Sequence, residues 1–484
     1  MSDERSNRLV RGRTDGANEG ASARTPDRLT GSVVVVALVS AISGLLYGYD
    51  TGIISGALLQ IGEDFGIGTG WEQVIAASIL VGAVIGALTC SYLAEHRGRR
   101  GTLLLIGIVF VVGALAASAS PNPVTLSLSR LVLGFAVGGA TQTAPVYVAE
   151  LAPTAYRGRL VLFFQIAIGV GIVIATIVGA AQVIDWRVAI GAAAVPAALM
   201  FLLMLRLPES PRWLASQHDD EGARTALTRV RHPDSDVTAE LEEIQENVQA
   251  EQEAGTRSWP GLKAAWVRPA LVVGCGLAIF TQLSGIEMIV YYTPTILTDS
   301  GFSDSTALLV SVALGLTYLI AQLVGLAIID RVGRRRLTLL TLPVAAAALI
   351  VLGTFFIGGN PDRANIPWIV TTLVVFMAFT AGGIQLMGWL TGSEIYPLAT
   401  REAGAAAQSA SLWGTNVLIT LTLLSTIEAI GTGQTFWMYA LFNIAAFIFL
   451  YRKMPELTGH SLEDIEHHLS KGQFRPQDFA RVRT

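Results

Sequence analysis

The chain contains twelve apolar stretches, and each is long enough to cross a lipid bilayer as one helix. A bilayer core about 30 Å thick requires about 20 mostly apolar residues, and only helices and closed barrels satisfy their backbone groups there. Charged residues make up 14% of the 484 residues, whereas soluble domains carry about 25%. The sequence therefore predicts an all-α membrane protein. The expected spans cover residues 33–58, 73–94, 101–120, 124–149, 160–184, 187–207, 269–297, 306–330, 337–358, 366–396, 402–426 and 434–451.

The spans form two groups of six, separated by a polar insert rich in acidic residues such as Glu240 and Glu243. We expect this insert to form short amphipathic helices on the membrane surface. The first residues are polar and predict a disordered tail. The expected organisation is an N-terminal tail at 1–31, a first six-helix bundle at 32–214, a linker at 215–265, a second bundle at 266–452 and a C-terminal tail at 453–484.

Three short motifs recur in both halves of the chain in the same order. Residues 96–100 (HRGRR) are echoed by residues 330–335 (DRVGRR), and the Glu-x-x-Pro motif of Glu150 is echoed by that of Glu394. The Pro-Glu pair at Glu209 returns at Glu456. Three pairs in one order indicate a duplicated six-helix unit. Transporters use such repeats to move two bundles about a site near the membrane midplane.

Arginine and lysine residues collect in alternate loops, which predicts the orientation of the chain. Residues 97–100 and 331–336 carry such clusters, as do the linker and the segment after the last span. The opposite loops carry little positive charge, with Arg187 and Arg363 as exceptions. Because positively charged loops stay inside, we expect a multi-pass protein of the cell membrane with both termini in the cytoplasm.

An acidic residue, Asp50, lies inside the first apolar span, and a basic residue, Arg130, lies inside the fourth. An ionised group at the bilayer centre costs about 2.5–3.5 kcal/mol on insertion scales, so such residues usually face a wet cavity and pair. Both residues fall in the outer part of the membrane, so they can meet. An acid and a base on different helices indicate a proton relay or a substrate path. The alternative is a static buried ion pair.

Six motifs lie in register along the chain: residues 48–52 (GYDTG), 145–153 (PVYVAELAP), 208–213 (PESPRW), 282–285 (QLSG), 330–335 (DRVGRR) and 393–397 (SEIYP). Together they resemble the sugar porter family of the major facilitator superfamily. The resemblance implies a secondary active transporter that imports a monosaccharide or polyol by alternating access, without a cofactor. In this family an acid at the Asp50 position is similar to the proton-coupled members, and Arg130 is its partner. An uncoupled facilitator and a transporter-like nutrient receptor are the alternatives.

The resemblance also implies a substrate site made of amide and indole groups. Sugars need hydrogen-bonding amides and aromatic faces. A lone membrane glutamine otherwise joins helices, and a lone tryptophan marks the interface. Trp413 and Asn416 are three residues apart and share one helix face. The matching positions are Gln165, Gln282, Trp389, Trp413 and Asn416.

Several residues depart from the family pattern. Thr281, Tyr318 and Leu412 stand where the family usually has an amide, and Glu287 replaces a common asparagine. The pocket is therefore not expected to be a standard hexose pocket. Glu287 has three interpretations: it accepts hydrogen bonds from a polyol, which we favour, it titrates with a coupled proton, or it stabilises the fold.

Two further groups of residues have roles implied by the family. Tyr291 and Tyr292 are expected to gate the outer mouth, or else to form an aromatic belt. The charged motifs are expected to latch the two halves together on the cytoplasmic side, with Arg157 meeting Glu150 and Arg401 meeting Glu394. Their alternative role is to set topology alone. The remaining latch residues are Arg99, Arg100, Asp330, Arg334, Arg335, Glu209 and Arg212.

Other classes of protein are disfavoured by the sequence. The net charge of −4 gives no reason to expect a nucleic-acid partner. Cys90 and Cys275 lie in apolar stretches and have no metal-ligand spacing. We expect no enzyme activity, no metal and no cofactor, and a protein that functions as a monomer in the lipid bilayer. A drug exporter would need a site less directed at hydroxyl groups.

Overall fold

The computed structural model describes residues 30–153, 156–181, 184–253, 259–359, 361–397, 400–458, 460 and 462–479. The disordered tail expected at 1–31 lies outside these residues, apart from Thr30 and Gly31. The described part contains twelve helical spans of sufficient length and hydropathy to cross a membrane, as predicted.

The helices of the two bundles have the following bounds. The N-terminal bundle comprises α2 (Gly31–Phe65), α3 (Thr69–Arg97), α4 (Arg99–Ser118), α5 (Pro123–Leu151), α6 (Arg157–Ala180) and a sixth span divided into α7 (Trp186–Gly191) and α8 (Ala194–Arg206). The C-terminal bundle comprises α12 (Arg268–Leu283), α13 (Ile286–Asp299), α14 (Asp304–Val332), α15 (Arg334–Thr354), α16 (Ile366–Ala381), α17 (Ile384–Glu394), α18 (Arg401–Ile430) and α19 (Thr432–Lys453).

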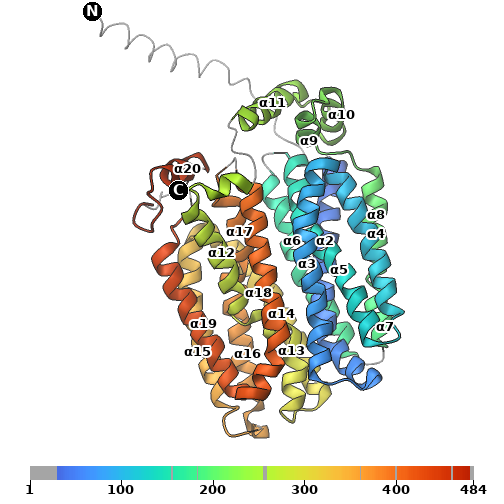
Figure 1. Cartoon of the computed structure of the whole chain (residues 1–484), viewed down its shortest axis with the longest axis vertical. Helices are drawn as coiled ribbons and strands as arrows, with labels where there is room; N and C mark the ends of the chain where they lie inside the picture. The colour runs from blue at the N-terminus through green and yellow to red at the C-terminus, as the bar shows by residue number, and fades with distance from the viewer. Residues whose placement is uncertain are drawn as a thin grey trace, which may run out of the picture.

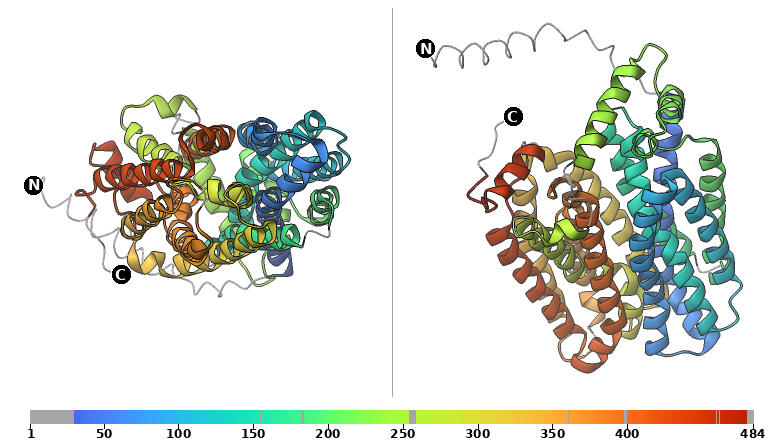
Figure 2. Two further views of the ribbon diagram at one scale, coloured as in Figure 1. Left: turned by 90° about the horizontal axis from the view of Figure 1, so that it is seen from below. Right: turned by 45° about the horizontal axis from the view of Figure 1, so that its top comes forward.

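The two bundles stand side by side (Figures 1 and 2). Their interface is formed by α2 against α13, α3 against α18 and α6 against α14. Three linker helices lie at one end of the molecule (Figure 1), which we call the linker end: α9 (Pro211–Ser216), α10 (Asp220–Val230) and α11 (Val237–Glu253). The opposite end is the far end.

The segment after the last span is folded, which was not foreseen. Helix α20 (Leu462–Ser470) lies at the linker end of the C-terminal bundle (Figure 1). Its Ile465 and Leu469 share a buried apolar cluster with Ile329 of α14 and Leu450 of α19. This apolar contact attaches the C-terminal segment to the second bundle.

Two spans of the C-terminal bundle are broken near their middle. The first break separates α12 from α13 at Gly285, whose φ of 93° lies in the left-handed region that favours glycine. The second separates α16 from α17 at Gly382 and Gly383. These breaks place Glu287 and Gln385 in the first turns of new helices, close to the bundle interface.

Close packing of small residues fixes the position of α2. A Cβ added to Gly48 would lie 1.9 Å from the Ile168 carbonyl oxygen of α6. Only glycine permits this approach, which is the way membrane helices commonly pack. The contact holds α2 against α6, and Asp50 lies half a turn further along α2.

Candidate functional site

The structure brings Asp50 and Arg130 together inside the N-terminal bundle. The Arg130 Nη2 lies 3.4 Å from the Asp50 Oδ2, and its Nε donates to the Ile75 carbonyl at 2.9 Å. Arg130 is 0% exposed and Asp50 is 7% exposed. The Arg130 Nη1 has no hydrogen-bond partner among the described residues. Separating two buried opposite charges is costly unless another group replaces the lost partner.

Three aromatic rings meet at the interface between the bundles. Tyr47 of α2 lies 6.3 Å from Trp389 of α17 and 5.3 Å from Trp413 of α18, measured between ring centroids. The two tryptophan rings are 6.1 Å apart. Such rings can cover the C–H face of a sugar. Tyr47 was missed in the sequence analysis, although it precedes Asp50 by three residues and therefore shares its helix face.

The predicted amide residues are buried and incompletely hydrogen-bonded. Within the described structure the Gln165 Nε2, the Gln282 Oε1 and the Asn416 Nδ2 have no partner, and neither has the Trp413 Nε1. The Asn416 Oδ1 accepts from the Thr420 hydroxyl at 3.2 Å. Each buried group left unsatisfied costs about 1–3 kcal/mol. A hydroxyl-rich ligand or water would supply the missing partners.

Glu287 is 4% exposed and lies in the first turn of α13. Its Oε1 accepts from the Gln385 Nε2 at 3.5 Å, and its Oε2 has no hydrogen-bond partner in the described part of the chain. The Tyr47 and Tyr318 hydroxyls are close enough to interact with its charge. No ion pair to Glu287 is formed among the described residues, in contrast to Asp50.

Two buried glutamines were missed in the sequence analysis. Gln322 of α14 is 0% exposed, and neither atom of its amide has a partner among the described residues. Gln385 of α17 is also buried. Each is four residues from a position considered in the sequence, Tyr318 and Trp389 respectively, and therefore lies on the same helix face. That periodicity was the signal available to find them.

The two tyrosines expected to form the outer gate are inside the protein. The Tyr292 hydroxyl donates to the Thr420 carbonyl at 3.0 Å, and the Tyr291 hydroxyl lies beside Thr51 of α2. Both rings are buried, which separates them from the lipid-facing surface. Their gating role stays a prediction.

Hydrogen bonds join the two bundles at two levels. At the far end, the Thr69 hydroxyl donates to the Glu428 Oε1 at 2.6 Å, and the Gln73 Nε2 donates to the Ser425 hydroxyl at 2.8 Å. Nearer the linker end, Gln142 of α5 contacts Ser409 of α18. Together these contacts tie α3 and α5 to α18.

Several latch residues make contacts within one bundle. Glu150 pairs with Arg99 at 3.0 Å, and the Arg157 side chain is exposed. No ion pair between Glu150 and Arg157 is formed in the described structure, in which Arg99 at the start of α4 pairs with one carboxylate oxygen of Glu150, the Oε1. Asp330 pairs with Arg334 at 2.7 Å. The side chain of Glu394 lies outside the described residues, so its pairing with Arg401 stays a prediction.

The remaining latch residues hold helix ends. Glu209 accepts from the backbone N–H of Arg100 at 3.0 Å, and Glu456 accepts from that of Arg334 at 2.9 Å. The two contacts are equivalent in the two bundles and cap α4 and α15. The Arg335 Nη2 donates to the Tyr451 carbonyl at 2.9 Å. The Arg212 side chain of α9 is half-buried.

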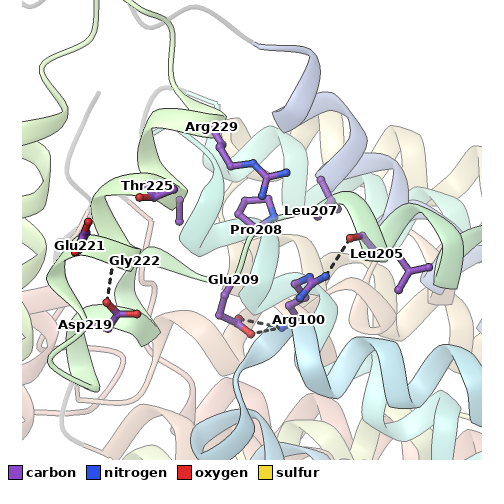
Figure 3. A pocket seen from close by; sticks show the side chains of 11 residues that line it. Arg100, Leu205, Leu207, Pro208, Glu209, Asp219, Glu221, Gly222, Thr225 and Arg229 are labelled. Atoms are coloured by element: carbon purple, nitrogen blue, oxygen red, sulfur yellow. Dashed lines mark hydrogen bonds between the residues drawn. The ribbon is translucent and has the colours of Figure 1, made fainter.

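A hollow of about 450 Å³ lies at the linker end, between α10 and the ends of α4 and α8 (Figure 3). Several of its polar groups are engaged by other parts of the protein. The Arg100 Nη2 donates to the Leu205 carbonyl at 3.0 Å, and the Arg229 Nη2 donates to the Arg206 carbonyl at 2.8 Å. Asp219 caps α10 through the Gly222 N–H at 2.9 Å. The hollow is far from the aromatic and amide groups of the interface, and its side chains stabilise helix termini.

Two six-helix bundles that share a buried polar centre define a membrane transporter of the major facilitator type. The chain belongs to the sugar transporter family, because the model described as "Sugar (and other) transporter" matches residues 36–469. The resemblance inferred from the sequence motifs is thereby confirmed, and the chain is a multi-pass sugar transporter.

Named relatives and a solved structure are similar over most of their length. The chain is 38% identical to a D-xylose transporter of Levilactobacillus brevis over 88% of this chain and 93% of that protein. It is 35% identical to the major myo-inositol transporter IolT of Bacillus subtilis over 90% and 93%. The proton:xylose symporter XylE of E. coli superposes with a TM-score of 0.76 at 25% identity, over 91% of this chain and 99% of that structure.

Proposed function

We propose that the protein imports a monosaccharide or polyol together with a proton, by alternating access of the central site. The buried pair of Asp50 and Arg130, next to a centre lined by rings and amides, carries this proposal. The relatives named for D-xylose and myo-inositol, and the proton symporter of similar structure, support it. An uncoupled facilitator with a static ion pair is the second candidate, because the same geometry would serve it.

The pair sits where it can respond to movement of the bundles. Asp50 and Arg130 belong to the N-terminal bundle, and Tyr291 of the C-terminal bundle lies beside Thr51, the next residue after Asp50. A nearby arginine favours an ionised carboxylate, whereas separation in a dry site favours a protonated one. A rearrangement that opens the interface would therefore load or release a proton at Asp50.

We further propose that the linker end faces the cytoplasm in the cell membrane and that the protein acts as a monomer. Arginine clusters at residues 97–100 and 331–336 lie at this end, as the positive-inside rule requires of a cytoplasmic face. Protease treatment of sealed right-side-out vesicles tests the placement. External protease should leave the linker and both termini intact, because they lie inside such vesicles.

Asp50→Asn is the direct test of coupling. In proteoliposomes, the variant should lose uphill accumulation driven by a proton gradient and keep exchange of substrate across the membrane, because the site remains and the proton carrier is removed. The transported probe is whichever hexose, pentose or inositol raises the melting temperature of the purified protein.

Asp64→Asn is the matched control. Asp64 lies on the same helix, but its ion pair with Arg187 at 2.7 Å is partly exposed at the far end. This variant should accumulate substrate as the unmodified protein does. Gradient-driven accumulation that survives in Asp50→Asn would reject Asp50 as the proton carrier. Absence of uphill accumulation in the unmodified protein would reject coupling and favour the facilitator.

A further inference from the structure

Gln322 is a buried amide that the protein leaves without hydrogen bonds. It lies in the middle of α14, and neither its Oε1 nor its Nε2 has a partner among the described residues. Gln408, a buried glutamine of α18 in the same bundle, provides the contrast. Its Nε2 donates to the Gly388 carbonyl at 2.8 Å and its Oε1 accepts from the Tyr396 hydroxyl at 3.1 Å. Buried polar groups are nearly always satisfied, so the exception requires an explanation.

Gln322 faces the opposite bundle at a point one helical turn from a predicted substrate residue. A Cβ added to Gly169 of α6 would lie 3.1 Å from the Gln322 Oε1. Gly169 follows Gln165 by four residues, so both lie on one face of α6. The Gln165 Nε2 also has no partner within the described structure. Unsatisfied amides from two bundles therefore face the same part of the interface.

The same face of α14 continues into the central site. Tyr318 precedes Gln322 by four residues, and its hydroxyl is close to both Glu287 and Gln385. Gln385 in turn precedes Trp389 by four residues on α17. Gln322 thus extends the polar wall of the site along α14 towards the linker end. This wall restores amide groups that the residues Thr281, Tyr318 and Leu412 do not provide.

We propose that Gln322 determines specificity by binding two neighbouring hydroxyls of the transported sugar or polyol. Its Nε2 donates to one hydroxyl and its Oε1 accepts from the next, while the Gln165 Nε2 donates from the other bundle. An amide has one donor and one acceptor side, which match a vicinal diol. This inference rests on the proposed function. A ligand bound in this way joins α6 to α14 and so favours closure of the bundles around it.

Binding of deoxy analogues to Gln322→Leu tests this role. The probe is the member of a set comprising D-xylose, D-glucose and myo-inositol that binds the purified protein best, together with its monodeoxy analogues. One analogue should bind the unmodified protein about tenfold more weakly than the parent, as expected when a hydrogen bond worth about 1.4 kcal/mol is lost. In Gln322→Leu, the parent should weaken by a similar factor and the same analogue should not.

Two further variants make the result specific. Gln408→Leu makes the same chemical change at an amide satisfied by protein, so it should lower the melting temperature and leave discrimination between analogues unchanged. Gly169→Ala introduces a methyl group against the Gln322 Oε1 and should weaken binding of the parent more than binding of the analogue. Gly169→Ala also tests the role of Gln322 if Gln322→Leu fails to fold.

The outcomes separate this inference from the proposed function. Unchanged discrimination in a folded Gln322→Leu or Gly169→Ala protein would overturn the role of Gln322 alone. Failure of every sugar and polyol to bind the unmodified protein would overturn the proposed function, and this inference with it.

Discussion

The two bundles treat buried polar groups in different ways. In the N-terminal bundle, charges are paired: Asp50 with Arg130 and Glu150 with Arg99. In the C-terminal bundle, two spans are broken and the interface carries neutral amides, together with Glu287, which has no ion pair among the described residues. Charge chemistry and hydroxyl recognition are therefore concentrated in different halves of a duplicated fold. A protein that moves its two bundles against each other can couple this charge chemistry to hydroxyl recognition through the interface between the bundles.

The largest expected effect contrasts Arg130 with Glu287. Arg130→Leu removes one partner of a buried pair and leaves Asp50 uncompensated, which typically costs about 3–5 kcal/mol. Glu287→Gln keeps the shape of the side chain and removes a charge that no neighbouring cation balances. We therefore expect the free energy of unfolding to change by about 1 kcal/mol or less. Thermal unfolding of the purified variants in one detergent measures both.

The double variant Asp50→Asn with Arg130→Leu is the control for this contrast. Removing both charges should recover much of the stability lost in Arg130→Leu, because no unpaired charge remains. Equal destabilisation by Arg130→Leu and Glu287→Gln would break the comparison between the bundles. It would mean that Glu287 is held by a charge partner in the folded protein.

A smaller effect on stability is expected where the two bundles make equivalent contacts. Glu209 caps α4 and Glu456 caps α15 through equivalent backbone contacts. Replacing either glutamate by Gln removes a negative charge that stabilises the helix N-terminus. The free energy of unfolding should fall by about 0.3–1 kcal/mol. The two variants should lower the melting temperature by similar amounts. Glu243→Gln, at an exposed position of α11, should have no measurable effect. A loss confined to one bundle would show that the repeat does not extend to this contact.

Much of the fold followed from the sequence because it depends on local composition. A run of about 20 mostly apolar residues specifies a span whatever it contacts, so all twelve spans of the described residues were predicted. The breaks at Gly285 and Gly382 were not, because a glycine within an apolar span does not reveal its φ angle. Helix α20 was missed since its apolar residues Ile465 and Leu469 are spaced among polar residues and gain stability only against the bundle.

The candidate site was predictable only where family positions or single charges marked it. Asp50 and Arg130 stood out because ionised residues are rare in membrane spans, and the structure pairs them. Gln322 and Gln385 carried no such mark, since a lone amide in a span usually joins helices. Their importance became visible only in the structure, because atoms of their buried amides lack hydrogen-bond partners among the described residues. The pairing of Glu150 with Arg99 also depends on how α4 and α5 pack, which spacing along the chain does not give.

The smallest expected effect concerns the surface helices that cover the linker end. An ion pair between Arg231 and Glu240 at 2.6 Å joins α10 to α11 in the linker. On the C-terminal bundle, the Asp464 Oδ2 of α20 lies 2.5 Å from the His460 Nδ1, and its Oδ1 lies 3.3 Å from the His468 Nδ1. The hydrogen bond from His460, followed by the nearby charges of His468 and His460, lowers the pKa of Asp464 below its ordinary value.

A depressed folded-state pKa fixes the sign of the pH dependence. The stabilising contribution of Asp464 is fully present above the unfolded value of about 3.9 and is lost as the pH falls through the lower folded value. Asp464→Asn should therefore lower the melting temperature slightly, by an amount that shrinks as the pH falls below about 4. The effect should be small because Asp464 is 39% exposed and its interactions are screened by solvent. If the difference between the two proteins instead persisted or grew as the pH fell below about 4, the attachment of α20 would not depend on the ionised carboxylate, and the apolar contacts of Ile465 and Leu469 would account for it.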